Sequence, residues 1–284
     1  MEAKRRPGPA SPGGPSPAGK QKAKIRAEDL RKSFGEKVVL EGVSLSVPEG
    51  ESLVIVGPSG TGKSVLLKHL IGLLRPDSGK VYVDGIDVWG LSERDLNTLR
   101  KQFGMAFQEG ALFDSMNVFD NVAFPLRRSG RPPDQVRARV RECLEMVHLP
   151  GIEQKRTSEL SGGMRRRVGF ARAIAHEPDI LLFDEPNTGL DPIMTDVINE
   201  IILELKERLD VTIVTITHHI ESARKIADRV ALLNRGQIVF EATPDEFLRS
   251  DHPAVRQFVE GRAQGPLTVE EYERKPAGAA EDKT

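Results

Sequence analysis

Cysteine is almost missing from this sequence. Cys143 is the only one in 284 residues, which excludes an intramolecular disulfide and favours a reducing compartment. Long apolar runs are missing too, because VLLKHLIGLL and VTIVTIT are shorter than the ~20 residues that a helix needs to cross a bilayer. No signal peptide is evident, and a net charge of -1 argues against a protein that coats a polyanion. These absences predict a soluble cytosolic protein that reaches any membrane through a partner.

Composition changes near residue 25. The segment 1–24 is rich in proline, glycine and serine and is basic, so it buries too little apolar surface to offset its ordering entropy. We expect it to be a disordered basic tail. From 25 to 250 the sequence is globular in texture and shows no internal repeat, which predicts one domain. The extension 251–284 is expected to be helical in part, where Val255, Phe258 and Val259 form a short apolar face, and then disordered.

Predicted strands and helices alternate through the domain. The β-branched runs VVLEGVSLSV, SLVIV and KVYVD come first, followed by a mostly helical stretch from about 92 to 176. Alternation then resumes with the strands DILLF, VTIVTIT and RVALLN and the helices IMTDVINEIILELKERL and HIESARKIAD. This order predicts an α/β fold with a parallel sheet that is covered on both faces.

A glycine-rich loop directly follows the predicted strand SLVIV. The segment GPSGTGKS at 57–64 fits G-x-x-x-x-G-K-[ST] at every defined position, and a helical pattern follows it. Glycines let the backbone N–H groups point at phosphate oxygens, while Lys63 should contact the β and γ phosphates and Ser64 should ligate Mg²⁺. The predicted nucleotide site comprises Gly57, Pro58, Ser59, Gly60, Thr61, Gly62, Lys63, Ser64 and Val65.

Polar side chains end three further predicted strands. Asp184, at the end of ILLFD, is expected to hold Mg²⁺ through water, and Glu185 should point at the γ phosphate. One of His218 and His219, after VTIVTIT, is expected to sense the γ phosphate, and Gln108, after FGMAF, to complete the magnesium shell. A kinase would need a base for an acceptor alcohol here, but Glu185 is better placed to polarise water, which predicts hydrolysis.

A second glycine pair lies in LSGGMRRR at 160–167. Free N–H groups of Ser161, Gly162 and Gly163 at a helix N-terminus would form an anion site. For the arginines at 165–167, a solvated or ion-paired helix face is favoured over phosphate contact. The ordered set of P-loop, glutamine after a strand, LSGG, DE after an apolar strand, and histidine resembles the nucleotide-binding subunit of ABC transporters over about 25–250.

That resemblance implies a fold, cofactors and a second subunit. The fold is the P-loop NTPase fold of ABC ATPases, with a RecA-like core sheet, a small antiparallel β subdomain and a helical subdomain at about 92–176. The cofactors are ATP and Mg²⁺. Two copies of the chain form an ATP-sandwich dimer, in which the LSGG helix of one copy caps the ATP that the other copy holds.

The resemblance also implies residue roles. Phe34 stacks on adenine, Gln108 couples nucleotide to permease, Glu185 is the general base, Asp191 crosses the dimer interface, and His218 is the switch histidine. The chain departs from the family at three positions, none of which removes a core phosphate contact. These are His219 in place of an acid, Met164 in place of glutamine, and Val65 in place of Thr or Ser.

Longer segments are similar to the ATPases of Mla-type phospholipid transport systems. They are GKSVLLKHLIGLLRPDSG, QEGALFDSMNVFDNVAFPLR, LSGGM and HPAVRQFVEG. This implies an MlaE-like permease and an MCE lipid-binding protein as partners, and a place at the cytoplasmic face of the inner membrane, bound through the permease. An ATPase of another solute importer remains the alternative. A soluble ABC ATPase acting on nucleic acid is disfavoured, since the chain has one cassette, no long insertion and little net charge.

Two apolar sets are expected to meet partners. Leu112, Phe113, Met116, Val118 and Phe119 stand in a loop after Gln108, where they would form a groove for a cytoplasmic helix of the permease. Packing inside the helical subdomain is the alternative for several of them. In the extension, Val255 and Phe258 are expected to hold two ATPases together.

Overall fold

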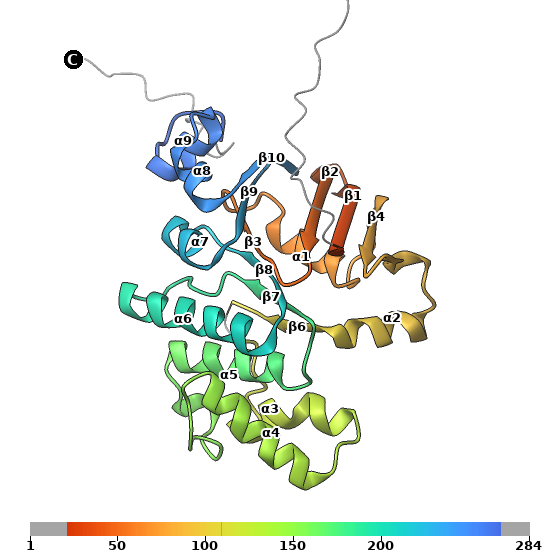
Figure 1. Cartoon of the computed structure of the whole chain (residues 1–284), viewed down its shortest axis with the longest axis vertical. Helices are drawn as coiled ribbons and strands as arrows, with labels where there is room; N and C mark the ends of the chain where they lie inside the picture. The colour runs from red at the N-terminus through yellow and green to blue at the C-terminus, as the bar shows by residue number, and fades with distance from the viewer. Residues whose placement is uncertain (1–21, 109, 268–284) are drawn as a thin grey trace, which may run out of the picture.

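The computed structural model describes residues 22–108 and 110–267, which form two sheets surrounded by helices (Figure 1). The predicted basic tail lies mostly outside these residues, as does the end of the extension from 268 to 284. Lys24, however, is only 6% exposed, and its ammonium lies 2.9 Å from Asp84 and 3.6 Å from Asp179. The predicted tail 1–24 is therefore too long at its end, because Ala23 and Lys24 already belong to a strand.

The larger sheet has six strands within the described residues, in the order β10-β9-β3-β8-β7-β6. Its members are β3 (Ser52–Val56), β6 (Phe103–Ala106), β7 (Ile180–Asp184), β8 (Thr212–Ile216), β9 (Arg229–Asn234) and β10 (Gln237–Ala242). All neighbours are parallel except β10, which pairs antiparallel with β9. Every residue of β3 and β8 is buried, as continuous aliphatic runs predict for a sheet covered on both faces.

The smaller sheet is antiparallel, with the strand order β2-β1-β4-β5. It consists of β1 (Ala23–Phe34), β2 (Lys37–Pro48), β4 (Ser78–Val83) and β5 (Ile86–Asp87). The sequence analysis missed β1 because its alternation breaks. Ile25 and Ala27 are buried, but Asp29 has a φ of 45° and the register shifts there, so that the next buried residue is Leu30. The predicted combination of a core sheet and a small antiparallel sheet is confirmed.

Helices cover both faces of the larger sheet (Figure 1). They are α1 (Lys63–Leu70), α2 (Glu93–Leu99), α3 (Val118–Arg128), α4 (Pro133–Met146), α5 (Gly162–Ile174), α6 (Pro192–Leu209), α7 (Ile220–Ile226), α8 (Pro244–Arg249) and α9 (Pro253–Glu260). None of the helices between residues 22 and 267 is long and apolar enough to cross a bilayer.

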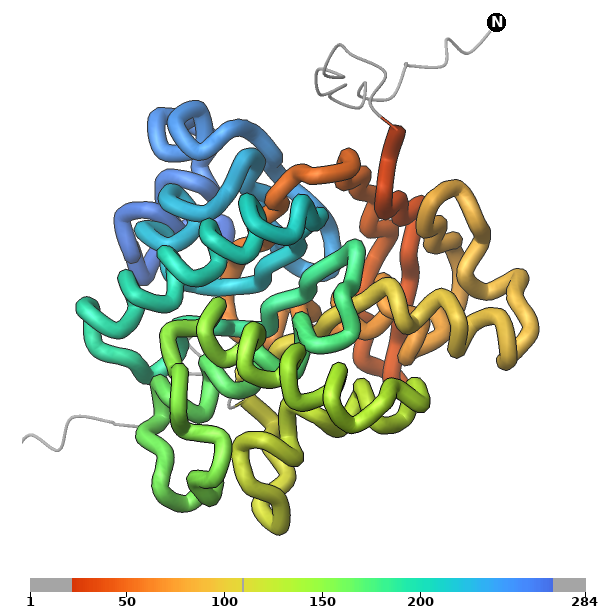
Figure 2. The backbone as a smooth tube through the Cα atoms, turned by 60° about the horizontal axis from the view of Figure 1, so that its bottom comes forward, coloured from red at the N-terminus to blue at the C-terminus, as the bar shows by residue number. Residues whose placement is uncertain are grey.

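The helices α3, α4 and α5 pack on one another and form the helical subdomain. Figure 2, turned so that the lower end of Figure 1 comes forward, brings α3 and α4 to the front. The predicted range 92–176 is not uniformly helical, since it includes β6, which pairs with β7 in the larger sheet. Leu96 and Leu99 of α2 pack in the cluster that joins the two sheets and do not pack with α3 and α4.

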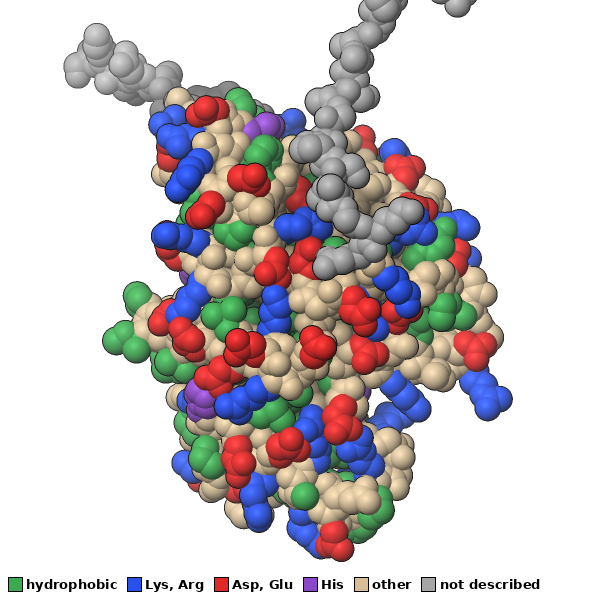
Figure 3. Space-filling view, viewed as in Figure 1, with side chains coloured by type: hydrophobic (Ala, Val, Ile, Leu, Met, Phe, Trp, Pro, Cys, Tyr) green, Lys and Arg blue, Asp and Glu red, His purple; other side chains and the backbone are tan. Residues whose placement is uncertain are grey.

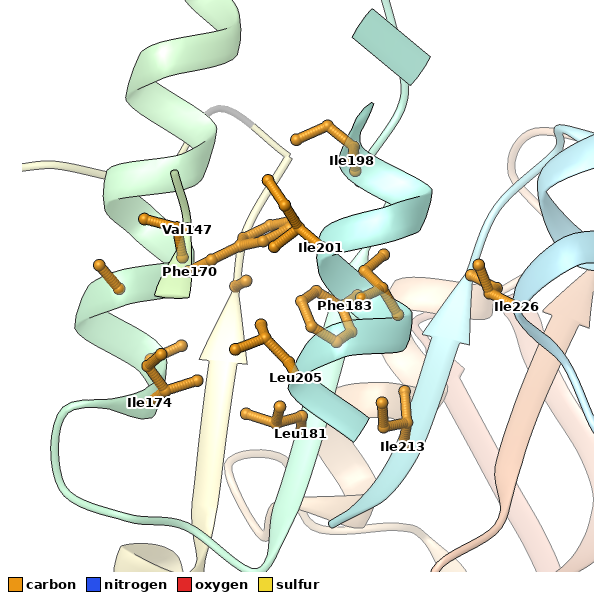
Figure 4. Packing of buried hydrophobic residues seen from close by; sticks show 14 of the residues in the cluster. Val147, Phe170, Ile174, Leu181, Phe183, Ile198, Ile201, Leu205, Ile213 and Ile226 are labelled. Carbon is orange, nitrogen blue, oxygen red and sulfur yellow. The ribbon is translucent and has the colours of Figure 1, made fainter. Parts of the chain in front are cut away.

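The larger core lies between α5, α6 and the sheet (Figure 4). Phe170 of α5 and Phe183 of β7 are almost fully buried and meet edge to face, with ring centroids 4.8 Å apart. Ile201 and Leu205 of α6 close this core from the other side. Burial of each such side chain stabilises the folded state by roughly 1.5–3 kcal/mol. This core therefore holds β7 and the start of the loop that follows it in place.

The extension packs on its own chain. Val255 and Ala254 of α9 are buried in the same core as Phe247 of α8, and Phe258 packs against it. Gln257 fastens the following turn, because its Oε1 accepts from Leu267 N at 2.7 Å. The expectation that Val255 binds a second ATPase is therefore wrong, since this chain already buries the side chain.

Candidate functional site

The glycine-rich loop 57–62 joins β3 to α1 at the carboxyl edge of the larger sheet. Gly57 has a φ of 151°, and a Cβ there would lie 2.2 Å from Leu233 O; Gly62 has a φ of 97°, and its Cβ would lie 2.8 Å from Val39 O. Both positions therefore require glycine. Thr61 Oγ1 donates to Pro58 O at 2.9 Å and tightens the curl. The loop is thus a preformed cradle whose N–H groups and helix N-terminus favour an anion.

Lys63 folds back over this loop. Its ammonium donates to Gly57 O at 2.8 Å and to Pro58 O at 3.0 Å, and it lies 3.8 Å from Glu185 Oε1. Burial lowers the pKa of Lys63, and the carboxylates of Glu185 and Asp184 oppose that shift. A compact cation is therefore held between the loop and the acidic end of β7, within reach of a phosphate in the cradle.

Ser64 and Asp184 provide hard oxygen atoms beside the loop. The hydroxyl of Ser64 donates to Asp184 Oδ1 at 3.1 Å. Burial raises the pKa of Asp184, and the bond from Ser64 opposes the shift. In the described part of the chain, no group of three or more His, Cys, Asp or Glu side chains is arranged so that it could hold a metal ion by itself. The donor set therefore suits a cation such as Mg²⁺ that takes its remaining ligands from phosphate and water.

Glu185 and His218 are brought together from neighbouring strands. Nδ1 of His218 lies 2.8 Å from Glu185 Oε2, and Thr188 Oγ1 donates to the same oxygen at 3.1 Å. Glu185 has a φ of 50°, a conformation that costs a non-glycine residue about 1–3 kcal/mol. Its backbone N–H donates to Ile216 O of β8 at 2.9 Å, which helps to hold the strained turn. The carboxylate is thus fixed at the mouth of the cradle, where it can take a proton.

A hollow of about 400 Å³ connects these groups to the smaller sheet. It is lined by Phe34, Lys37, Val39, Ser59, Gly60, Gly62, Lys63, Ser64, Val65 and Glu185. Phe34 is half exposed, so its ring face is available for stacking. Lys37 and Val39 were missed by the sequence analysis, although the hairpin that pairs Phe34 with Lys37 was a usable signal.

The LSGG residues do not line this hollow. Ser161 precedes α5 and its Oγ accepts from Met164 N, while Gly162 has open space around it. Gly163 lies against Leu190 and Met194, on the side of α6. Asp191 caps α6 there by accepting from Ile193 N and Met194 N, both at 2.9 Å. The two motifs form a second region, separate from the loop 57–62 of the same chain.

Gln108 and the arginines of LSGGMRRR make contacts that involve main-chain carbonyl oxygens. Gln108 follows β6 and is exposed, and its main-chain oxygen accepts from Arg166 Nε at 2.6 Å. Arg165 and Arg167 donate to Leu160 O and His148 O. The predicted solvated or ion-paired face is therefore wrong for Arg166, which is buried and bonds to main-chain carbonyls.

The predicted apolar groove has a different composition. Val118 is fully buried in the helical subdomain, and Leu112 and Phe119 pack against the same core. A shallow hollow of about 350 Å³ exists nearby, but of the five expected residues only Phe113 lines it. Its lining is Met105, Phe107, Ala111, Phe113, Phe124, Pro125, Arg172, Ala173 and His176, called here the aromatic groove. The packing alternative was therefore correct for Val118, Leu112 and Phe119.

A buried polar network near Glu185 was also missed. The Asn187 amide donates to Asn199 Oδ1 at 2.8 Å and to Ser222 Oγ at 2.7 Å, and all three side chains are buried. The network ties the loop after β7 to α6 and α7. The sequence signal for this network is Asn199, a polar residue beside Ile198 on the apolar side of a predicted helix, because a polar side chain there needs a buried hydrogen-bond partner.

A family model described as ABC transporter matches residues 40–188. The chain belongs to the ABC transporter ATPase family. It is 45% identical over 260 residues to the probable ribonucleotide transport ATP-binding protein mkl of Mycobacterium tuberculosis, covering 91% of this chain and 72% of that protein. It is 42% identical over 255 residues to the intermembrane phospholipid transport system ATP-binding protein MlaF of Escherichia coli, covering 89% and 93%. The methionine import ATP-binding protein MetN of Carboxydothermus hydrogenoformans is 46% identical over 221 residues, covering 78% and 66%.

A solved structure agrees with this assignment. The chain is similar to the ATP-binding cassette MJ0796 in a dimeric post-hydrolysis state bound to ADP and Pi, with a TM-score of 0.71 and 33% identity over 78% of this chain and 98% of that one. The protein is thus the ATP-binding subunit of an ABC transporter, and ATP hydrolysis coupled to transport follows from the family.

Proposed function

We propose that this chain is the ATPase of a phospholipid transport system that works with an MlaE-like permease and an MCE lipid-binding protein. The observation that carries the proposal is the extent of the similarity to MlaF, which covers 93% of that relative and 89% of this chain. The chain would be peripheral, at the cytoplasmic face of the inner membrane, and bound through the permease.

The residues around the loop 57–62 support hydrolysis of ATP. Its N–H groups and the Lys63 ammonium bind the β and γ phosphates, and Phe34 stacks on adenine. Ser64, Asp184 and Gln108 would hold Mg²⁺, and the ion would neutralise charge on the phosphate oxygens.

Glu185 is the proposed general base. Its carboxylate takes a proton from water as the water oxygen attacks the γ phosphorus, and the bond from that phosphorus to the β-bridging oxygen breaks. His218 and Thr188 both bond to this carboxylate, so they orient it. Because the backbone of Glu185 is strained, the carboxylate is positioned before substrate arrives and little ordering is left for the reaction.

A second copy of the chain completes the site. Ser161, Gly162 and Gly163 would cap the ATP of that copy, and Asp191 would lie at the interface. Two observations support this: these residues do not line the hollow of their own chain, and the similar cassette MJ0796 is dimeric.

The aromatic groove is the proposed seat of the permease helix. Phe113 and Phe124 line it side by side, with ring centroids 4.9 Å apart, and Phe113 is 42% exposed while Phe107 is 36% exposed. Exposed aromatic side chains that gather in one hollow are more typical of a binding surface than of the rest of a protein surface.

A different transported solute is the alternative, because mkl and MetN are similar at comparable identity and carry other substrates in their names. A soluble ABC ATPase acting on nucleic acid is less well supported. On the face shown in Figure 3, acidic and basic side chains are interspersed, and a continuous basic patch of the kind that binds nucleic acid is lacking there.

Co-expression with an MlaE-like permease tests the proposal. We expect a complex with two copies of each subunit whose ATPase rate exceeds that of the ATPase alone. Phe113→Asp in the aromatic groove should abolish co-purification, whereas Ile86→Asp, an exposed apolar position on β5, should not. Failure of the wild type to bind, together with binding to the permease of another solute importer, would favour the alternative.

A further inference from the structure

Arg166 joins two segments that lie far apart in the sequence. It is 8% exposed at the start of α5, its Nε donates to Gln108 O at 2.6 Å, and its Nη2 donates to Thr188 O. One carbonyl belongs to the segment after β6 and the other to the loop after β7. A guanidinium is a rigid planar fork, so it fixes the direction and the separation of the two carbonyls at once.

Gly110 and Ala111 are also held to α5 from the side of the aromatic groove. Arg172, which lines that groove, donates to Ala111 O at 2.8 Å and to Gly110 O at 2.9 Å. Between the two arginines the backbones touch, because a Cβ on Gly169 would lie 2.8 Å from Gly110 Cα. A displacement of the groove must therefore move Gly110 and α5 together. In Figure 1, α5 lies between the helices α3 and α4 and the helix α6.

On the other side of Arg166, the loop after β7 controls the Glu185 carboxylate. Thr188 contributes its carbonyl to Arg166 and its hydroxyl to Glu185 Oε2. The backbone N–H of Thr188 closes the same turn by donating to Glu185 O at 3.4 Å. A change at the Thr188 carbonyl is thus transmitted through a single residue to the proposed base.

We propose that Arg166 is a positioning residue that couples the aromatic groove to Glu185. Arg172 and Arg166 stand on the same helix, α5, which therefore links the groove to the Thr188 carbonyl and, through the Thr188 hydroxyl, to the carboxylate. The identity of the groove's occupant rests on the proposed function. The action of Arg166 on Glu185 does not depend on it, so the two can fail separately.

Steady-state kinetics of the full-length ATPase test the action on Glu185. Arg166→Gln should lower kcat about tenfold, or about 1.4 kcal/mol, and leave the KM for ATP within about twofold. Arg166→Lys should fall in between, since an ammonium reaches one of the two carbonyls. Arg165→Gln is the matched control: Arg165 is exposed, donates to Leu160 O, and should retain the wild-type kcat. Thermal unfolding shows whether each variant is folded. If Arg166→Gln does not fold, the kcat of Arg166→Lys is compared with that of the wild type instead.

A double-mutant cycle tests the route. Thr188→Val removes the hydroxyl bond to Glu185 and keeps the carbonyl, so its effect on kcat should not add to that of Arg166→Gln. Additive losses, or an Arg166→Gln enzyme that matches the Arg165→Gln control, would overturn the proposal.

In the complex, the permease should stimulate the Arg166→Gln enzyme less than the wild type, and equal stimulation would refute the link to the groove. A wild type that no permease stimulates would count against the proposed function, while the cycle would still report on Arg166.

Discussion

Ser161 allows a direct test of which copy of the chain the LSGG residues serve. The side chain is exposed and its Oγ accepts from Met164 N at 3.3 Å, so Ser161→Arg removes one helix cap, which costs about 1 kcal/mol of stability. The arginine also places bulk and positive charge at a helix N-terminus that should face a phosphate. The Ser161→Arg variant should still fold and form the dimer, but its anion site at this helix N-terminus should be lost. Ser158→Arg, at an exposed position three residues before Ser161, is the control.

The decisive sample is a mixed dimer with one Lys63→Ala subunit and one Ser161→Arg subunit. If the LSGG residues act on the partner's ATP, both lesions fall on one composite site and the other site is intact. A dimer with two equivalent sites should then keep about half of the wild-type activity, provided that the sites work independently. If each chain used its own LSGG residues, both sites would be damaged.

The assay uses the permease complex, in which two copies of the ATPase are held together. The two variants carry different affinity tags, and successive purification on both tags isolates the mixed dimer. We expect each variant alone to be nearly inactive and the mixed dimer to recover activity. A mixed dimer as inactive as its parents would refute the trans arrangement.

Three further predictions concern the base, the extension and the buried carboxyl. Glu185→Gln should lower kcat by about 10²–10⁴-fold with ATP binding nearly intact, measured by single-turnover hydrolysis and nucleotide titration; near-normal turnover would show that another residue is the base. Val255→Ala should cost about 2 kcal/mol of unfolding free energy in denaturant titrations, because Val255 is fully buried, while Arg256→Ala on the exposed side of α9 should stay within about 0.5 kcal/mol; equal losses would contradict the packing of α9. Asp184→Asn should raise the unfolding midpoint of the nucleotide-free protein at neutral pH, because burial raises the pKa of Asp184 and so its ionised form destabilises the folded state. That gain should vanish as the pH falls through the pKa of Asp184, where the wild-type carboxyl is neutral, and a gain independent of pH would contradict it.

The sequence predicted best those features that depend on neighbouring residues. The loop 57–64 requires glycine at fixed positions between a strand and a helix, so its pattern is legible without a tertiary structure. The parallel order of β6, β7 and β8 follows from strand–helix alternation, and it brings the segment after Gly104–Ala106 to the edge that holds Asp184. Whether Gln108 ligates a metal there stays a prediction.

The features that the sequence did not predict depend on contacts between distant segments. Arg166 is flanked by two other arginines, and its burial depends on contacts with distant segments, among them the carbonyls of Gln108 and Thr188. The sequence around Val255 shows an apolar helix face, but it does not show which core covers that face. The strand β1 escaped detection because the bulge at Asp29 interrupts its period.

The most direct test of the proposed function is lipid transfer by the reconstituted complex. Proteoliposomes that contain the ATPase, the MlaE-like permease and the MCE protein are mixed with acceptor vesicles, and movement of a fluorescent phospholipid between the two is followed. We predict transfer that requires ATP with the wild type and no transfer with Glu185→Gln. A complex that hydrolyses ATP without moving phospholipid, or transfer that continues at the wild-type rate with Glu185→Gln, would contradict the account.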